Sequence, residues 1–194
     1  MRLTREAKAE HHEEIVSAAS KMLRQRGIER TSVIDLMEAV GLTHGGFYRH
    51  FKSKDDLVAE STVQAFTETV ARLEEPRGTI GPKAALRAYI DAYLSEDHIE
   101  HPEGGCPVAA YGADAARQND MVRDAFSEGI DRMITLVSDG LSCPKEERQA
   151  RAIELLAMLS GAIVMARASN DPKLSRQILA SCHRRALRLM DEKR

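Results

Sequence analysis

Apolar residues recur at helical spacing along almost the entire chain, and this property restricts the fold more than any other. Near the start, Ile15, Ala18, Ala19, Met22 and Leu23 lie at positions i, i+3, i+4, i+7 and i+8. Such spacing places them on one face of an α-helix. Similar stripes continue to the C-terminus, whereas no stretch of useful length alternates as a half-buried strand would. The sequence therefore predicts an all-α fold of about nine helices.

Turn and capping residues divide the chain into candidate helices and connections. Ser53 followed by Asp56 is a capping pattern, and it predicts a long helix over residues 54–74. Turn-forming residues in segment 74–82 predict a break there, the best candidate for the end of an N-terminal unit. Segment 95–105 is polar and contains Pro and Gly, so we expect a loop.

Two short helices joined by a tight turn form the most informative part of the sequence. Residues 33–40 and 44–51 read as helices, and the intervening Gly-Leu-Thr reads as the turn. This is a helix-turn-helix pattern, which predicts a DNA-binding domain over residues 1–54 and a second helical domain over residues 55–194. Such helix pairs also occur in all-α proteins that do not bind DNA, so the pattern alone leaves both readings open.

The second short helix has the chemistry that a DNA major groove requires. Gly45 and Gly46 leave its first turn slender, so its backbone can approach a duplex closely. The hydroxyl of Thr43 and the free N–H groups of the helix start suit a phosphate. Side chains with base-edge or phosphate chemistry follow on the same segment. They are His44, Tyr48, Arg49, His50, Lys52 and Lys54.

Composition limits the remaining classes. The net charge of −2 argues against a strongly basic nucleic-acid binder, although residues 1–55 hold ten Lys and Arg against eight Asp and Glu. No window of about 18 apolar residues is evident, so we expect no membrane span. Three widely spaced cysteines without a CxxC pair indicate a reducing, cytoplasmic setting. No sequence pattern calls for a cofactor.

Segment 31–57 closely resembles the signature of the TetR family of transcriptional regulators. The matching positions are Thr31, Val33, Leu36, Ala39, Gly41, Leu42, Thr43, Gly45, Phe47, Tyr48, His50, Phe51, Lys54 and Leu57. Met37 departs from the pattern, where a smaller residue is common, and we interpret it as a packing change. The resemblance implies a homodimer that binds double-stranded operator DNA and represses promoters until a small molecule binds. It also adds Thr31 to the candidate DNA contacts.

The resemblance places the dimer interface on the last two helices. Both have apolar faces too broad for one neighbouring helix, which favours a four-helix interface between two copies. Ordinary core packing within one chain is the alternative. The candidate interface residues are Leu155, Leu159, Ala162, Ile163, Ile178, Cys182 and Ala186.

A ligand cavity is expected among the middle helices. Aromatic and methionine side chains would supply an apolar wall with few polar groups, although each is also an ordinary core residue at helical spacing. The candidates are Tyr89, Tyr93, Cys106, Tyr111, Phe126, Met133 and Met158.

Cys106 carries a second hypothesis about sensing. It precedes Pro107 at a predicted helix start, where the pKa of a thiol is lowered, so an electrophile or redox switch is conceivable. A buried, inert cysteine is the competing interpretation. Asp97, His98, His101 and Cys106 could surround a metal, but a solvated turn explains them better, and we predict no metal site.

Two further function classes compete with a regulator. The sequence has no nucleophile elbow, phosphate-binding loop or HExxH motif, so we predict that the protein is not an enzyme. A helical interaction module that has lost DNA binding is the other class. The weak net charge permits it, whereas Tyr48, Lys52 and Lys54 argue against it.

Overall fold

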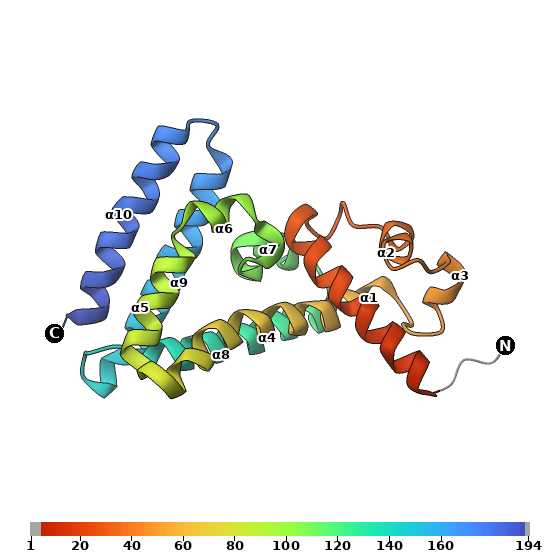
Figure 1. Ribbon diagram of the computed structural model, residues 1–194, viewed down its shortest axis with the longest axis horizontal. Coiled ribbons are helices and arrows are strands. Elements are labelled where there is room, and N and C mark those ends of the chain that lie inside the picture. The colour runs from red at the N-terminus through yellow and green to blue at the C-terminus, as the bar shows by residue number, and fades with distance from the viewer. Residues whose placement is uncertain (1–4, 193–194) are drawn as a thin grey trace.

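The computed structural model describes residues 5–192, and within this range the chain is all-α (Figure 1). It has ten α-helices and one 3₁₀ helix, η1, which confirms the fold class but adds a helix to the expected nine. No strand occurs among the described residues. The elements are α1 (Arg5–Arg26), α2 (Val33–Ala39), α3 (His44–Phe47), α4 (Lys54–Ile80), α5 (Pro82–Tyr93), α6 (Glu96–Glu100), η1 (Pro102–Gly104), α7 (Pro107–Ala115), α8 (Asp120–Asp139), α9 (Lys145–Ala168) and α10 (Pro172–Asp191).

Local signals fix the ends of the first helices. Gly27 ends α1 with a φ of 78°, a left-handed conformation that other residues disfavour. The hydroxyl of Ser32 accepts a hydrogen bond from the Asp35 N–H at 3.1 Å. Ser53 and Asp56 form a complete capping box, because each side chain accepts from the other's backbone N–H. These caps set α2 and α4 where the sequence predicts them.

Helix α4 runs further than the sequence suggests, so the break predicted over segment 74–82 is confined to Gly81 near its end. Pro76 lies inside the helix and costs it one backbone hydrogen bond. The helix nevertheless continues, because it packs along α8, α1 and α5 and buries Leu73 in the core. The chain turns only at Gly81, where φ is 81°, and Pro82 then begins α5.

The buried apolar residues form two cores, a small one at the N-terminal end of α4 and a large one along the length of α4. The small core joins α1, α2 and α3 around Ile15, Leu36 and Phe47. The large core unites the remaining helices and also includes Leu23 and Ile28 at the end of α1. Figure 1 shows α1, α2 and α3 at one end of the molecule, with α4 leading away towards α5, α9 and α10. We call α1, α2 and α3 the small lobe, and α4 to α10 the large lobe.

The connection between α5 and α7 is ordered helical structure, so the polar loop predicted over 95–105 is wrong. The hydroxyl of Ser95 caps α6 by accepting from the His98 N–H at 3.2 Å. Pro102 then opens η1. The polar side chains of this segment face solvent at its edge, while His98 is buried. The Ser95 cap and the two short helices thus provide hydrogen bonds for the backbone of this segment, while most of its polar side chains remain in solvent.

Helix α9 is long and apolar enough to cross a membrane by length and composition, and it is the one such helix among the described residues. Length and composition alone do not overturn the expectation of no membrane span, because core helices can have the same length and composition. Helix α9 packs against α7, α8 and α10 and contributes Leu155, Leu159 and Ile163 to the large core. Its remaining apolar residues lie on a second face, which explains its high hydropathy.

Candidate nucleic-acid interface and ligand pocket

The tip of the small lobe presents α3 and the turns on either side of it to solvent. Helix α3 is regular only over His44–Phe47, shorter than the predicted 44–51. The N–H groups of Arg49 and His50 bond three residues back, in tight turns, and Phe51 completes one α-type bond to Phe47. Thr43 occupies the N-cap position, but its hydroxyl makes no capping hydrogen bond. The exposed residues of this tip are Thr43, His44, Gly45, Tyr48, Arg49 and Lys52.

The two glycines of α3 have different roles. A Cβ at Gly46 would lie 3.5 Å from the Met37 side chain, an ordinary van der Waals contact, so Gly46 faces α2. Met37 is fully buried, as expected of a packing change. A Cβ at Gly45 would meet nothing within 4 Å. The fold therefore does not require Gly45 to be bare, whereas a closely approaching partner would.

Aromatic packing holds this tip to the small core. The rings of Phe47 and Phe51 stack with centroids 5.4 Å apart and are both buried. Tyr48 points the other way and is 67% exposed. Its ring meets His44 edge-on at 5.9 Å. Anchoring residues and outward polar residues thus alternate along one short segment.

Two of the predicted DNA contacts turn inward. Thr31 is fully buried, and its hydroxyl donates to the Gly27 carbonyl oxygen at 2.7 Å. Its side chain supports the α1–α2 connection, so we remove it from the contact set. The Lys54 ammonium donates to the Ile28 carbonyl oxygen at 2.9 Å and ties the same connection to α4.

His50 lies half-buried beside His11 and His12. Its Nδ1 has no hydrogen-bond partner among the described residues. Burial, followed by the nearby positive charges of His12 and Lys8, lowers its pKa. The lowered pKa favours the neutral ring, in which one nitrogen donates a hydrogen bond and the other accepts one.

A buried arginine joins the small lobe to the large one. The side chain of Arg24, on α1, is completely enclosed and forms an ion pair with Glu68 of α4. Its Nη1 donates to the Gly105 carbonyl oxygen at 3.4 Å, and its Nε donates to the Ser20 carbonyl oxygen at 3.1 Å. Arg24 therefore touches α1, α4 and the segment that precedes α7.

A hydrogen bond also joins the C-terminal end of α1 to α7. The Ile28 N–H donates to the Asp114 carboxylate at 3.2 Å. A Cβ at Gly27 would lie only 2.5 Å from the same carboxylate, so this contact requires glycine. Gln25 reaches Glu103 of η1 at 3.4 Å. Displacement of the η1–α7 segment would therefore move α1.

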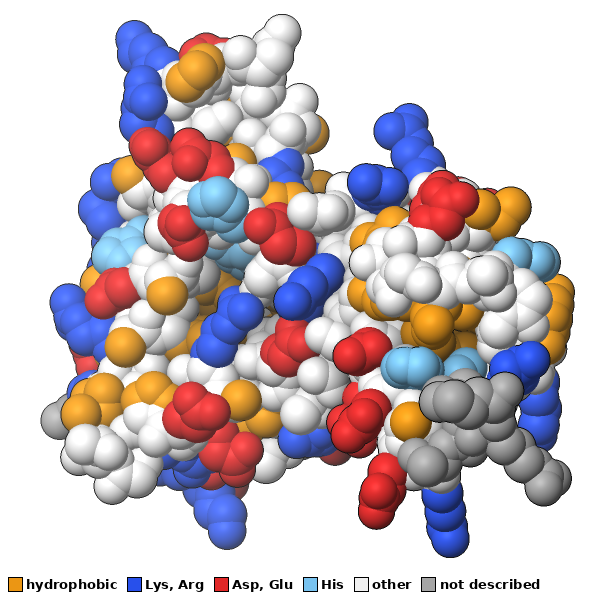
Figure 2. Space-filling model, turned by 45° about the vertical axis from the view of Figure 1, so that its right-hand side comes forward, with side chains coloured by type: hydrophobic (Ala, Val, Ile, Leu, Met, Phe, Trp, Pro, Cys, Tyr) orange, Lys and Arg blue, Asp and Glu red, His pale blue; other side chains and the backbone are white. Residues whose placement is uncertain are grey.

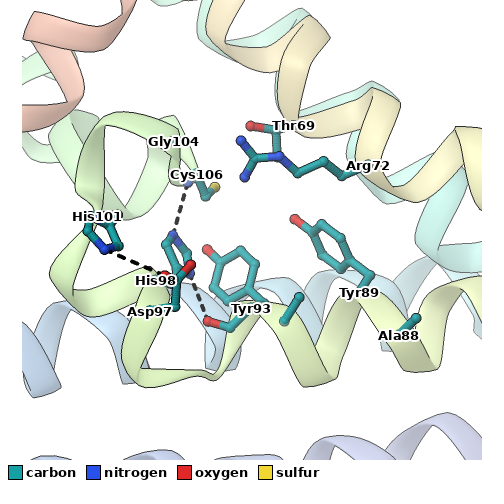
Figure 3. Close-up of a pocket in the computed structure, with 11 residues that line it drawn as sticks. Thr69, Arg72, Ala88, Tyr89, Tyr93, Asp97, His98, His101, Gly104 and Cys106 are labelled. Atoms are coloured by element: carbon teal, nitrogen blue, oxygen red, sulfur yellow. Dashed lines mark hydrogen bonds and ion pairs between the residues drawn. The ribbon is translucent and has the colours of Figure 1, made fainter.

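A pocket of about 390 Å³ lies between α4, α5, α6 and η1 (Figure 3). This volume falls within the range of small-molecule sites. Three of the predicted ligand residues, Tyr89, Tyr93 and Cys106, line it. Its other lining residues, which the sequence did not single out as ligand contacts, are Thr69, Arg72, Ala88, Ala92, Asp97, His98, His101 and Gly104.

His98 organises one wall of this pocket. Its Nδ1 donates to the Tyr93 carbonyl oxygen at 2.7 Å, and its Nε2 accepts from the Cys106 N–H at 3.2 Å. Arg167 of α9 donates to the His98 carbonyl oxygen. Burial lowers the pKa of His98 to about 4. The neutral ring is the form that accepts at Nε2, so this contact between α6 and α7 depends on it.

The other four predicted ligand residues lie elsewhere. Tyr111 and Phe126 pack edge-on, 5.3 Å apart, in the large core, and the Tyr111 hydroxyl donates to Thr62 at 3.3 Å. Met133 lines a small apolar hollow between α7, α8 and α9. Met158 packs against the large core. Helical spacing alone could not separate these core residues from the pocket wall.

The prediction of a lowered thiol pKa at Cys106 is wrong. Cys106 stands at the N-cap of α7, but it is buried, and burial raises its pKa. Desolvation of the thiolate outweighs the stabilisation by the helix N-terminus. The structure thus gives no support to sensing through a reactive Cys106. Among the described residues, no group of three or more His, Cys, Asp or Glu could hold a metal ion.

Most of the predicted dimer-interface residues belong to the chain's own core. Ile178 and Cys182 are half-buried, and the others are buried. The buried ones are Leu155, Leu159, Ala162, Ile163 and Ala186. Helix α9 has apolar residues on two faces, and its residues in the predicted interface lie on the inner face.

The outer face of α9 carries a separate apolar stripe. Ile153, Val164 and Met165 are 48%, 49% and 60% exposed. Ala157 and Gly161 lie between them, and a Cβ at Gly161 would meet nothing within 4 Å. On α10, Leu174 is also exposed. Large apolar residues that flank small ones suit close packing against another helix.

Charges of both signs are interspersed over the face shown in Figure 2, which includes part of the small lobe. This agrees with the net charge of −2. Any recognition of DNA must therefore depend on a local arrangement at the tip rather than on a broad basic surface.

Family models match both parts of the chain. The model for bacterial regulatory proteins of the tetR family matches residues 15–61, and the model for the C-terminal domain of LmrA/YxaF-like transcriptional regulators matches residues 82–179. The chain belongs to the TetR family of transcriptional regulators. Proteins of this family bind DNA operators and are generally dimeric, and the family is one of regulators rather than enzymes.

Individual relatives are more distant. An uncharacterised HTH-type transcriptional regulator of Mycobacterium tuberculosis is 27% identical over 170 residues, which cover 82% of this chain and 85% of that protein. The HTH-type transcriptional regulator TtgR of Pseudomonas putida is 32% identical over 99 residues, 50% of this chain and 47% of that protein.

Solved TetR structures share the fold over nearly the whole chain. A TetR-family regulator from Cytophaga hutchinsonii superposes with a TM-score of 0.76 and 22% identity, and the match covers 100% of both chains. A TetR regulator from Chloroflexus aurantiacus gives 0.75 and 25% identity, covering 94% of this chain and 95% of its own. The helix-turn-helix assignment and the all-α architecture are thereby confirmed.

Proposed function

We propose that this TetR-family protein is a ligand-responsive repressor that binds a palindromic operator in the cytoplasm as a homodimer. The observation that carries this proposal is the exposed tip of the small lobe, in which Gly45 is bare although the fold leaves room for a side chain. Close approach of DNA would explain why this position has no side chain. The proposed contacts are Thr43, His44, Gly45, Gly46, Tyr48, Arg49, His50 and Lys52, with Lys54 supporting them from behind.

The proposed dimer forms through the outer face of α9 together with α10. This surface replaces the inward-facing set expected from the sequence, and Ile178 and Cys182 are the members of that set retained in it. Ile153, Val164 and Met165 supply the apolar area, while Gly161 allows close approach. Two-fold symmetry then sets two tips on one face of a duplex, about 34–36 Å or somewhat farther apart.

We propose residues 1–54 as the DNA-binding unit and residues 55–194 as the unit for ligand binding and dimerisation. A molecule in the pocket contacts Gly104 and Cys106, which flank Gly105, the residue bonded to Arg24. A shift of this segment would change the angle of α1 and α4, and with it the spacing of the two tips. The ligand must bind one spacing better than the other for such coupling to occur.

The DNA contact is tested by selection from a random-sequence duplex library, followed by affinity measurements on the recovered site. We expect enrichment of an inverted repeat and a steep loss of affinity with salt. Tyr48→Ala should weaken binding at least about tenfold through a lost phosphate contact. Ile80→Ala, at a half-exposed apolar position at the far end of α4, is the control and should change nothing.

Two results would replace this proposal. Absence of any enriched sequence at moderate salt would favour an interaction module that has lost DNA binding. Steady turnover of a metabolite by the purified protein would instead revive an enzyme.

A further inference from the structure

The ligand pocket contains two polar groups that have no partner. The Tyr89 hydroxyl is buried, and no described residue lies within hydrogen-bonding range of it. Tyr89 itself is 6% exposed. Arg72 lines the same pocket and is exposed to solvent; its guanidinium makes no hydrogen bond or ion pair within residues 5–192, although it lies close to Gly104. Figure 3 shows both groups directed towards the same part of the pocket.

An unpartnered buried hydroxyl costs stability, and natural structures contain few of them. The free groups at this position are the five N–H donors of a guanidinium and one O–H donor. What the pair lacks is an acceptor that both can reach. An anion with two oxygens supplies one.

The remaining charges around the pocket favour an anion further. Arg167 interacts electrostatically with both Tyr93 and Cys106. The opposing carboxylate is Asp97, but its side chain is 84% exposed and lies 3.6 Å from His101. Water screens the exposed charges of Asp97 and Arg72 alike, so the positive charge of the part-buried Arg167 is the least screened of the three.

The other walls suit a compact apolar body. The ring centroids of Tyr89 and Tyr93 lie 5.5 Å apart. Ala88 and Ala92, also on α5, line the pocket with small side chains that leave room for a ligand. The Tyr93 hydroxyl is already bonded to Ser160 at 3.2 Å. A flat ring or short chain of moderate size fits this lining.

We propose that the effector of this protein is a small carboxylic acid, bound by the Arg72 guanidinium and the Tyr89 hydroxyl with its apolar body against Tyr89 and Tyr93. A planar guanidinium matches a carboxylate with two parallel hydrogen bonds. The Tyr89 hydroxyl gains the acceptor it lacks. This inference deepens the proposed function, because it names the chemistry of the effector that would control operator release.

The test is calorimetry on the full chain with matched acids, amides and an amine. Benzoate and hexanoate are compared with benzamide, hexanamide and benzylamine. We expect each acid to bind at least about tenfold more tightly than its amide, since hydrogen bonds to charged groups are worth more. Benzylamine should not bind.

Two variants locate the site. Arg72→Met removes the guanidinium but keeps an unbranched apolar stem, and it should abolish the preference for acids. Tyr89→Phe should weaken acid binding several-fold and affect the amides less. Arg87→Met alters an exposed arginine of α5 outside the pocket and should leave all affinities unchanged. Unchanged melting temperatures without ligand would show that the variants fold.

The inference is overturned if neither acid binds, if amides bind as tightly as acids, or if Arg72→Met keeps the preference. Binding to the selected operator without ligand is measured on the same samples. A protein that binds acids but no operator would refute the proposed function while supporting the site. One that binds its operator but no acid would refute the site alone.

Discussion

The tip of the small lobe and the pocket of the large lobe use polar groups in opposite ways. At the tip, Tyr48, Arg49 and Lys52 project into solvent, and their anchors Phe47 and Phe51 lie behind them in a separate core. In the pocket, the polar groups are built into the wall itself. His98 holds α6 to α7 through both ring nitrogens.

This difference separates function from stability in one region and couples them in the other. Outward side chains at the tip can be replaced at little cost to folding, because water already solvates them. Replacing a buried polar residue near the pocket leaves its hydrogen-bond partners unsatisfied and lowers the free energy of unfolding. The following predictions break or sharpen this contrast.

The largest effect is expected at Arg24, where the two regions meet. Arg24→Met removes a fully enclosed cation and leaves Glu68 and the Gly105 carbonyl without their partner. We expect the free energy of unfolding to fall by about 3 kcal/mol or more. Chemical denaturation measures this loss. Arg26→Met, two residues further on and exposed, should shift it by less than about 0.5 kcal/mol. Equal effects of the two substitutions would refute the buried connection.

The next effect concerns His98 and pH. Its folded pKa of about 4 lies below the usual 6.5, so the unfolded chain takes up the proton first as pH falls. Its contribution is therefore complete above pH 6.5 and is lost as the pH falls from 6.5 to about 4, by up to about 3 kcal/mol. His98→Gln should flatten that limb of the stability curve. Parallel curves for the two proteins would show that His98 is not buried in its neutral form.

Cys106 should be slow to react. Burial and a raised thiol pKa both suppress attack by iodoacetamide at neutral pH. We expect labelling of native Cys106 to be more than about tenfold slower than in the denatured chain, followed by mass spectrometry of the peptide. Rapid native labelling would restore the electrophile-sensing hypothesis.

The smallest change in stability is expected at Gly45. Gly45→Ala adds a methyl group to open space and improves helix propensity, so stability should rise by up to about 1 kcal/mol. Operator affinity should nevertheless fall. Gly78→Ala is the control, because Gly78 is also a helical glycine with nothing within 4 Å of a new methyl group, and it lies near the far end of α4. A gain of stability at Gly45 without loss of affinity would contradict close approach of DNA.

Features that depend on neighbouring residues could be predicted from the sequence. The caps at Ser32 and Ser53, the glycine at the end of α1 and the helix-turn-helix all follow from local chemistry. The anchors Phe47 and Phe51 follow from their spacing of four. These signals were enough for the fold class and the family.

Features that depend on packing could not be predicted. Pro76 ordinarily disrupts a helix, yet contacts along α8 carry α4 through it. Helix α9 has apolar residues on two faces, and the spacing of these residues in the sequence does not indicate which face is buried. Arg72 and His98 meet in the pocket from distant parts of the sequence. At Cys106, burial outweighed the local effect of a helix start.

The central claim is that two copies of the tip lie along one face of a duplex. Methylation protection of guanine N7 on the selected operator tests it most directly, because N7 lies in the major groove. The account predicts two protected major-groove patches on the same face, with centres about one helical turn or somewhat more apart. Both patches should be lost together with Tyr48→Ala. A single patch, or protection that survives this substitution, would contradict the account.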